Sequence, residues 1–301
     1  MTEPYAPIRS EGDITPVVLK VMEQTDDPRL GEIMKSLVTH LHAFIRDVRL
    51  TEAEFQQATK ILNTMGQQSN DAHNEYVLMS GSLGVSSLVC LLNNGDNGAT
   101  ETAQNLLGPF WRANQPVTEN GGSILRSDTP GPRMETCFRV VDRAGAPIAD
   151  AEMDIWHASP VGLYEQQDPE QADHNLRGKF RTDAEGIVRF SSVRPVGYPI
   201  PTHTTVGKLL TQQHRHPYRP AHVHALVYKD GYKTMISQVY IDETEYLETD
   251  VQFGVTKTLT ARCTVETGPH PKEGDVGTWY TLDYTFVMEP GEARLPIPPI
   301  K

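Results

Sequence analysis

Two histidines, His222 and His224, stand two positions apart in a run of residues that predicts a β-strand. Side chains alternate across a strand, so both imidazoles project from one face, where they could form half of a metal site. A lone pair of this kind is weak evidence, because most such pairs are partly buried polar residues. A second pair, His214 and His216, is followed at once by Pro217 and predicts a loop.

Two tyrosines are candidates for the other half of the site. Tyr164 comes shortly after a predicted strand at 152–157, and Tyr198 lies in a proline-rich loop, 194–201, whose prolines fix φ. A free phenol has a pKa of about 10, so only a strongly Lewis-acidic ion would hold two phenolates at neutral pH. Two anionic oxygens beside two imidazoles favour the +3 state of iron, and we therefore predict a ferric site.

Composition limits the partners of this 301-residue chain. Lys and Arg number 27 against 39 Asp and Glu, which gives a net charge of −12 and no basic footprint for nucleic acid or an anionic membrane. No run approaches the roughly 18 apolar residues of a membrane span, and the first residues do not resemble a secretory signal. Three scattered cysteines, Cys90, Cys137 and Cys263, suit a reducing compartment. We expect a cytoplasmic globular protein.

The first third of the chain carries helical signals. Asp27 is a plausible cap for a helix at 28–48, where apolar residues recur every three or four positions. A capping-box pattern opens a second predicted helix at 51–66. A third helix is expected over 71–92, and the Asn- and Gly-rich segment 93–98 predicts the turn that closes the helical part.

After residue 108 the pattern changes to short β-rich runs separated by Gly, Pro and Asp, which predicts an antiparallel sandwich. The expected strands are Cys137–Val141, Glu152–Trp156, Ile187–Phe190, His222–Tyr228, Thr234–Ile241 and Trp279–Met288. We therefore expect an α+β chain. A helical domain, 1–105, would precede a β-sandwich domain, 106–301, that holds the predicted iron site.

Four segments of the chain occur in an order typical of one enzyme family. They are THLHAFIR at 39–46, the segment 140–164 that ends in DIWHASPVGLY, GYPIP at 197–201 and RHPYRPAHVH at 215–224. Each motif alone is modest, but together they are specific. They resemble the intradiol ring-cleavage dioxygenases, and the resemblance covers nearly the whole second part of the chain.

The resemblance implies an iron-dependent enzyme that cleaves an aromatic 1,2-diol with O2. The implied ligands of one Fe(III) per subunit are Tyr164, Tyr198, His222 and His224. Tyr198 would leave the metal and take a diol proton, and the ring would open between its two hydroxyl-bearing carbons to give a dicarboxylic acid. Arg219 and Gln238 would contact the substrate. An always-charged Arg219 suits a developing negative charge, and a surface salt bridge is its alternative role.

The face on which Gln238 projects depends on the hairpin at Asp230-Gly231. A three-residue loop pairs Gln238 with His224 and puts both side chains on one face. A strict two-residue turn pairs it with Val223 and sends it to the other face. We predict an odd loop or a bulge.

Within the family, segments 198–201 and 250–255 look more like the hydroxyquinol 1,2-dioxygenase branch than the plain catechol branch. This implies a hydroxymuconate product that tautomerises to maleylacetate. The resemblance implies these pocket walls: Leu78, Gly81, Leu107, Gly108, Pro109, Phe110, Ile200, Pro201 and Gln252. Leu78, Leu107 and Phe110 serve equally well as core residues.

Two departures from the family pattern bear on the substrate. Gly81 stands where hydroxyquinol-type members commonly carry Asp, and the segment 202–207 lacks their usual Asp-Gly-Pro. Chlorinated or alkylated diols therefore stay open as substrates. His203 is a pocket residue or, as we expect, an exposed loop residue.

The resemblance also implies a homodimer that forms through the N-terminal helices, often around a bound lipid. A helix face with Leu37, Leu41, Phe44 and Val48 could equally be intramolecular core. A catechol or chlorocatechol 1,2-dioxygenase is the alternative within the class. A metal-free β-sandwich binding module is the alternative outside it, and a zinc hydrolase would need a third His, Asp or Glu ligand.

Overall fold

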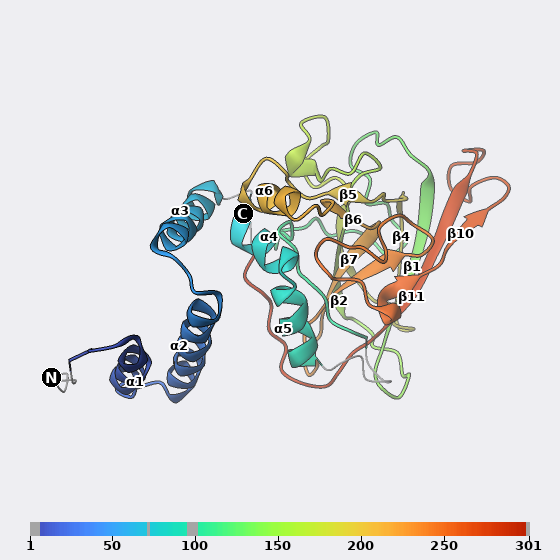
Figure 1. Cartoon of the computed structure of the whole chain (residues 1–301). Helices are drawn as coiled ribbons and strands as arrows, with labels where there is room; N and C mark the ends of the chain where they lie inside the picture. The colour runs from blue at the N-terminus through green and yellow to red at the C-terminus, as the bar shows by residue number, and fades with distance from the viewer. Residues whose placement is uncertain (1–6, 71–72, 95–101, 299–301) are drawn as a thin grey trace. The chain divides into compact units, whose positions relative to one another are not determined.

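The computed structural model describes residues 7–70, 73–94 and 102–298 (Figure 1). The chain forms two compact units, Met1–Asn63 and Thr64–Lys301. The first unit is helical, and the second contains two sheets with further helices.

The first unit contains α1 (Glu11–Met22), α2 (Pro28–Val48) and most of α3 (Glu52–Gln68). Asp27 caps α2 as predicted, because its carboxylate accepts hydrogen bonds from the backbone N–H groups of Arg29 and Leu30. The capping box before α3 is also confirmed: Thr51 Oγ1 accepts from Glu54 N, and the Glu54 carboxylate accepts from Thr51 N. Helix α1 was not predicted; it contains Pro16.

The single helix predicted at 71–92 is wrong. Two helices, α4 (Glu75–Ser82) and α5 (Val85–Asn94), occupy this region, and Gly84 between them has a φ of +72°. Such a φ breaks an α-helix and is easily adopted by glycine. The predicted turn at 93–98 lies mostly outside the described residues. No single described helix is long and apolar enough to span a membrane; α4 and α5 together, bent by 76°, pass that test by length and composition only.

Two sheets form the body of the second unit, one with the order β10-β11-β1-β4 and one with the order β3-β2-β7-β8-β9. The first consists of β1 (Arg133–Val141), β4 (Ile187–Val193), β10 (Cys263–Glu266) and β11 (Trp279–Val287). The second consists of β2 (Glu152–Trp156), β3 (Arg177–Arg181), β7 (His222–Tyr228), β8 (Met235–Ile241) and β9 (Thr260–Ala261). A separate short pair joins β5 (Tyr198–Pro199) to β6 (Tyr218–Arg219). All six predicted strands are present, whereas β3, β5, β6, β9, β10 and the helix α6 (Thr205–Gln212) were not predicted.

The sheets are mixed rather than purely antiparallel. Strand β11 runs parallel to β1, with Phe138 opposite Tyr284, and β9 runs parallel to β8. The other ladders are antiparallel, as expected. A parallel pair needs a long connection, and most of the second unit lies in sequence between β1 and β11.

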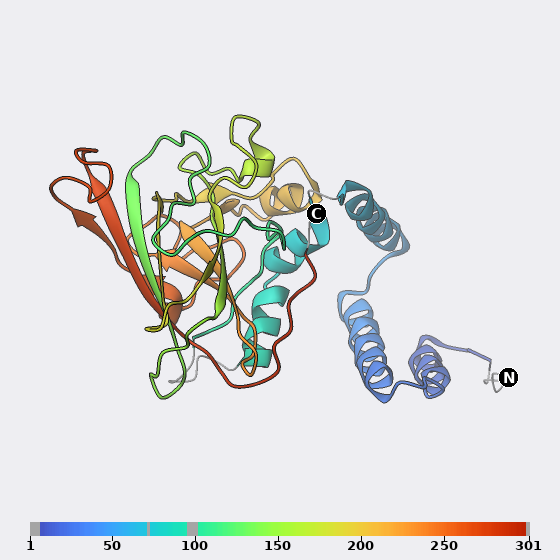
Figure 2. The same ribbon diagram turned by 180° about the vertical axis from the view of Figure 1, so that it is seen from behind.

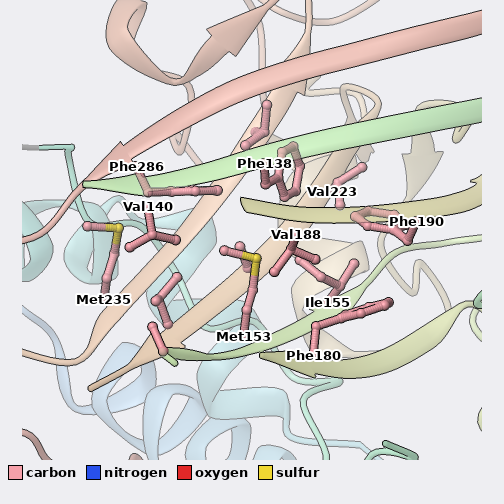
Figure 3. Close-up of a cluster of buried hydrophobic side chains, with 14 of the residues drawn as sticks. Phe138, Val140, Met153, Ile155, Phe180, Val188, Phe190, Val223, Met235 and Phe286 are labelled. Atoms are coloured by element: carbon pink, nitrogen blue, oxygen red, sulfur yellow. The ribbon is translucent and has the colours of Figure 1, made fainter. Parts of the chain in front are cut away.

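The hydrophobic core lies between the two sheets, where their inward-facing side chains meet (Figure 3). One sheet contributes Phe138, Val140, Val188, Phe190 and Phe286, and the other contributes Met153, Ile155, Phe180, Val223 and Met235. Because side chains alternate, the neighbours of Val223 on β7, His222 and His224, project from the opposite face of their sheet. Helices α4, α5 and α6 lie on one side of the sheets, and β10 and β11 lie at the far end of the unit (Figures 1 and 2).

The hairpin between β7 and β8 has the predicted odd loop. Val227 pairs with Met235 and His224 pairs with Gln238, so the connection contains an odd number of residues. Gly231 in the turn has a φ of +86°. The prediction that Gln238 shares a face with His224 is confirmed.

Candidate metal centre and substrate pocket

The four predicted metal ligands converge at one place in the second unit. The hydroxyl oxygens of Tyr164 and Tyr198 are 3.2 Å apart. The Tyr198 hydroxyl lies 3.5 Å from His222 Nε2, and that nitrogen lies 3.2 Å from His224 Nε2. All four side chains are buried.

Three different parts of the chain hold these side chains. His222 and His224 come from β7, the central strand of its five-stranded sheet, which pairs with β2. Tyr164 lies beyond the end of β2, where its backbone N–H donates to Gln167 Oε1 across a short 3-10 helix, Glu165–Gln167. Tyr198 belongs to β5, and its β6 partner is Arg219, so this small strand pair brings both to the edge of the site.

The histidine rings are fixed in orientation. His222 Nδ1 lies 2.7 Å from the carbonyl oxygen of Pro220 and donates to it, which leaves the Nε2 lone pair directed into the cluster. The His224 ring stacks on Trp156, with centroids 4.6 Å apart and an interplanar angle of 9°. The Nε2 atoms of the two rings therefore lie 3.2 Å apart, with both rings held in place.

Burial sets the charge state of the cluster. It lowers the pKa of His222 to about 3, with a further contribution from the Arg219 charge. Burial likewise lowers the pKa of His224 well below its usual value. It raises the pKa of Tyr198 and raises that of Tyr164 further. Neutral imidazoles are ready to bind a metal, and the phenols become phenolates only beside a cation.

The donor set fits a single ion. Ligands bound about 2.1 Å from one ion lie roughly 3 to 3.5 Å apart, as these atoms do. Two phenols with two imidazoles form a donor set that suits a ferric ion.

One other group of possible metal ligands occurs among the described residues, Glu165, Asp173 and His174. Arg112 donates to both carboxylates, and Arg177 donates to Glu165, so cationic partners already hold these acids. No third His, Asp or Glu joins His222 and His224 within the described part of the chain. The zinc-hydrolase alternative therefore lacks its third ligand.

Arg219 is not a surface residue, because only 2% of it is exposed. It forms a buried ion pair in which its Nε and one terminal nitrogen donate to the two oxygens of Asp250, at 3.1 and 3.0 Å. Its other terminal nitrogen lies 3.4 Å from His222 Nε2. The surface salt bridge considered for Arg219 is therefore wrong, and its charge lies beside the predicted metal ligands.

Gln238 is held by hydrogen bonds at both ends of its amide. Its Nε2 donates to the Leu106 carbonyl at 2.6 Å, and its Oε1 accepts from Tyr240 Oη at 2.7 Å. The same Tyr240 oxygen accepts from Arg219 at 2.7 Å. Tyr240 thus connects the two predicted polar residues.

Sequence reasoning missed Tyr240 and Asp250. Tyr240 could have been found, because it is two residues from Gln238 on a predicted strand and shares its face. Nothing in the local sequence marks Asp250 as the partner of Arg219, since the two meet only in the folded chain.

A pocket opens beside the cluster. It is lined by Leu78, Gly108, Pro109, Phe110, Gln167, Tyr198, Pro199, Ile200, Pro201, Arg219, His224 and Gln252. Seven of the nine predicted wall residues are among these. Gly81 lies beneath the side chain of Gln252, and Leu107 packs against the buried cluster around Trp156. His203 is exposed and lies outside the lining, as expected, and His214 and His216 are in loop structure.

Comparison with known proteins agrees with this geometry. Residues 106–289 match the family profile described as "Dioxygenase", and residues 27–100 match "Catechol dioxygenase N terminus". The chain is 37% identical over 276 residues to hydroxyquinol 1,2-dioxygenase of Rhizobium sp. (strain MTP-10005), covering 90% of this chain and 92% of that protein. It is also 37% identical over 232 residues to catechol 1,2-dioxygenase of Candida albicans, covering 76% of each.

The fold agrees as well. The crystal structure of hydroxyquinol 1,2-dioxygenase from Pseudomonas putida DLL-E4 aligns with a TM-score of 0.83 at 33% identity, over 93% of this chain and 99% of that chain. Three observations support one conclusion. The family profile matches most of the sheets, the relatives align along nearly the whole chain, and two tyrosines and two histidines form one cluster. The chain belongs to the iron-dependent intradiol ring-cleavage dioxygenases.

Proposed function

We propose that this enzyme uses O2 and one ferric ion per subunit to cleave a hydroxylated 1,2-dihydroxybenzene between its two hydroxyl-bearing carbons. Hydroxyquinol is the substrate that the relatives favour, and the product would be a hydroxymuconate that tautomerises to maleylacetate. The convergence of two phenols and two imidazoles beside a pocket is the observation that supports the proposal most directly.

Iron held by Tyr164, Tyr198, His222 and His224 would supply Lewis acidity that activates the diol. The side chains divide the remaining work. Tyr198 lines the pocket and Tyr164 does not, so the Tyr198 oxygen is the one placed to take a proton from a diol hydroxyl. Burial raises the pKa of Tyr198, which favours keeping that proton.

Arg219 lines the same pocket and is positioned to stabilise negative charge on the bound diol. Its ion pair with Asp250 fixes the guanidinium in place. Gln238 has both ends of its amide occupied and is absent from the pocket lining. We infer that Gln238 acts by holding Tyr240, and through it Arg219, rather than by touching the diol.

A catechol or chlorocatechol 1,2-dioxygenase is the second candidate. The identity to a catechol 1,2-dioxygenase of Candida albicans equals that to the hydroxyquinol enzyme, although over a shorter stretch. Leu78, Ile200 and Pro201 in the pocket wall suit an apolar ring substituent. The metal-free binding module is disfavoured, because all four ligands are present and converge.

We also propose a homodimer formed through the helical part, 1–105, with the catalytic part at 106–301. The predicted face on α2 supports this, since Leu37, Leu41, Phe44 and Val48 are each 48–53% exposed. A second copy, with or without a lipid chain, would cover them. A cytoplasmic location fits the three cysteines, which form no disulfide among the described residues.

The test is a visible spectrum of the iron-reconstituted protein before and after anaerobic addition of hydroxyquinol or catechol. Admission of ¹⁸O2 follows, with mass analysis of the product. We expect a tyrosinate-to-iron(III) band that shifts with the diol, and a dicarboxylic product that carries ¹⁸O. A protein that stays colourless after reconstitution and consumes no O2 would overturn the proposal.

A further inference from the structure

We propose that Gln252 determines substrate specificity by selecting diols that carry an uncharged hydrogen-bonding substituent on the ring, such as a third hydroxyl. The inference rests on the proposed function and specifies the substrate class of the same pocket. It follows from the position of the Gln252 side chain, which occupies the space next to Gly81.

The Gln252 side chain fills the space that any side chain at position 81 would need. A Cβ atom built on Gly81 would lie 2.8 Å from Gln252 Cδ, 3.0 Å from its Oε1 and 3.1 Å from its Nε2. The whole amide group therefore lies against the bare backbone of α4. Only glycine at position 81 leaves room for this placement.

The backbone around Gln252 is fixed from several sides. Its N–H donates to Asp250 Oδ1 at 3.2 Å, and its carbonyl accepts from Ser87 Oγ at 3.1 Å. Arg215 donates to the carbonyls of Ser82 and Val251, which ties the end of α4 to this loop. These hydrogen bonds fix the loop relative to α4, and so they fix the position of the Gln252 amide in the pocket wall.

The amide itself has no hydrogen-bond partner among the described residues, although Gln252 is only 4% exposed and lines the pocket. Its neighbours in the wall include Leu78, Ile200 and Pro201, which offer no side-chain hydrogen bond. A diol bound in this pocket would take the amide out of water, so a ligand gains by supplying a hydrogen-bond partner.

The chemistry of the amide defines the ligand class. A carboxamide both donates and accepts, so a ring hydroxyl can satisfy it. A methyl group or a chlorine atom in the same place would leave it unpaired, and sites of this kind discriminate strongly against such analogues. Leu78, Ile200 and Pro201 in the same wall carry no charge, so they offer no ion pair to an ionised substituent.

Hydroxyquinol and 4-methylcatechol form a matched pair for the test, because they differ by a hydroxyl in place of a methyl group. The kcat/KM ratio of the two should exceed tenfold in the natural protein and fall at least tenfold in Gln252→Leu. Anaerobic dissociation constants, followed by tryptophan fluorescence, should show the same shift. Gln67→Leu, at an exposed position on α3, serves as the control and should leave the ratio unchanged.

A double-mutant cycle tests the shared volume. Gly81→Ala should displace the amide and lower the ratio when Gln252 is present, but change it less than twofold in a Gln252→Ala background. A natural protein that cleaves no diol would refute the proposed function itself. Two other outcomes, in a natural protein that does cleave diols, would overturn this inference alone. One is a kcat/KM ratio of the two diols in Gln252→Leu within twofold of the natural ratio. The other is an equal loss of kcat/KM for both diols.

Discussion

Gln238 on β8 lies directly opposite His224 on β7 in the antiparallel ladder, and the two side chains share a face of the sheet. This register places Tyr240, two residues further along, on the same face and within reach of Arg219. A turn with one residue fewer would send Gln238 and Tyr240 into the core between the sheets. The odd hairpin loop is therefore a requirement of the site.

Tyr240→Phe should impair the enzyme without changing its fold. The substitution removes one oxygen and leaves an Arg219 N–H and Gln238 Oε1 buried without that partner, at a cost of about 1–3 kcal/mol in the free energy of unfolding. We expect a loss of about tenfold or more in kcat as Arg219 becomes less well held. Urea unfolding and steady-state kinetics give the two numbers.

Tyr284→Phe provides the matched control, because its hydroxyl donates to the Thr258 carbonyl away from the pocket. Equal losses of kcat in the two variants would contradict the role assigned to Tyr240.

Asp250→Asn should be among the more destabilising single changes in the second unit. The carboxylate accepts from Arg219 and from the backbone N–H groups of Gln252 and Gly254, all in a buried place. Removing one charge of a buried pair typically costs 3–5 kcal/mol, since the partner charge is left uncompensated. Chemical denaturation at neutral pH measures the change.

Asp173→Asn breaks an ion pair with Arg112 in which the aspartate side chain is 72% exposed, and we expect a loss under about 1 kcal/mol. Similar losses in the two aspartate variants would show that the Arg219–Asp250 pair is not an energetically distinct buried contact.

The arrangement of His222 and His224 could be predicted because it depends on one strand. The period of two places both rings on one face wherever the strand lies. The meeting of Tyr164 with Tyr198 could not be derived in this way. It depends on a close approach of two loops, in which a Cβ on Gly162 would come within 2.9 Å of Tyr198 Cβ. Only the family resemblance brought the two tyrosines together in advance.

The unpredicted helix α6 shows why short elements escape sequence analysis. The residue before it, Thr204, makes no side-chain cap. The first free N–H groups, at Thr205 and Val206, instead donate to Gln68 Oε1 and Glu75 Oε1 from helices far away in the sequence. A cap supplied by distant residues leaves no local signal.

His224→Ala should release the iron. The substitution removes one of four donors and leaves its stacking partner, Trp156, beside a cavity. Loss even of groups that support metal ligands weakens binding 10- to 100-fold, so we expect a retained iron content below about a tenth of the natural value. Elemental analysis and the visible absorbance measure it. His203→Ala, at an exposed position, should keep its iron and colour; retention of both by His224→Ala would rule out His224 as a ligand.

A buried histidine outside the ligand set should make stability depend on pH. His157 Nε2 lies 2.6 Å from Ser192 Oγ, and its Nδ1 donates to the Ala158 carbonyl. Burial lowers the pKa of His157 to about 4 from an ordinary value of 6.5. Between these two pH values the unfolded chain binds a proton that the folded chain does not. The free energy of unfolding should therefore fall as the pH drops through this window, by up to about 1.4 kcal/mol per pH unit, and level off below it.

His157→Gln isolates this contribution, because glutamine keeps a polar side chain but does not titrate. At a fixed iron loading, the stability difference between the natural protein and this variant should change with pH only between about 6.5 and 4, in favour of the variant as the pH falls. Denaturant unfolding at a series of pH values measures the difference. The same series for His203→Gln should show no such trend. A His157→Gln difference that is constant across the window would mean that the folded protein protonates His157 as readily as the unfolded chain does.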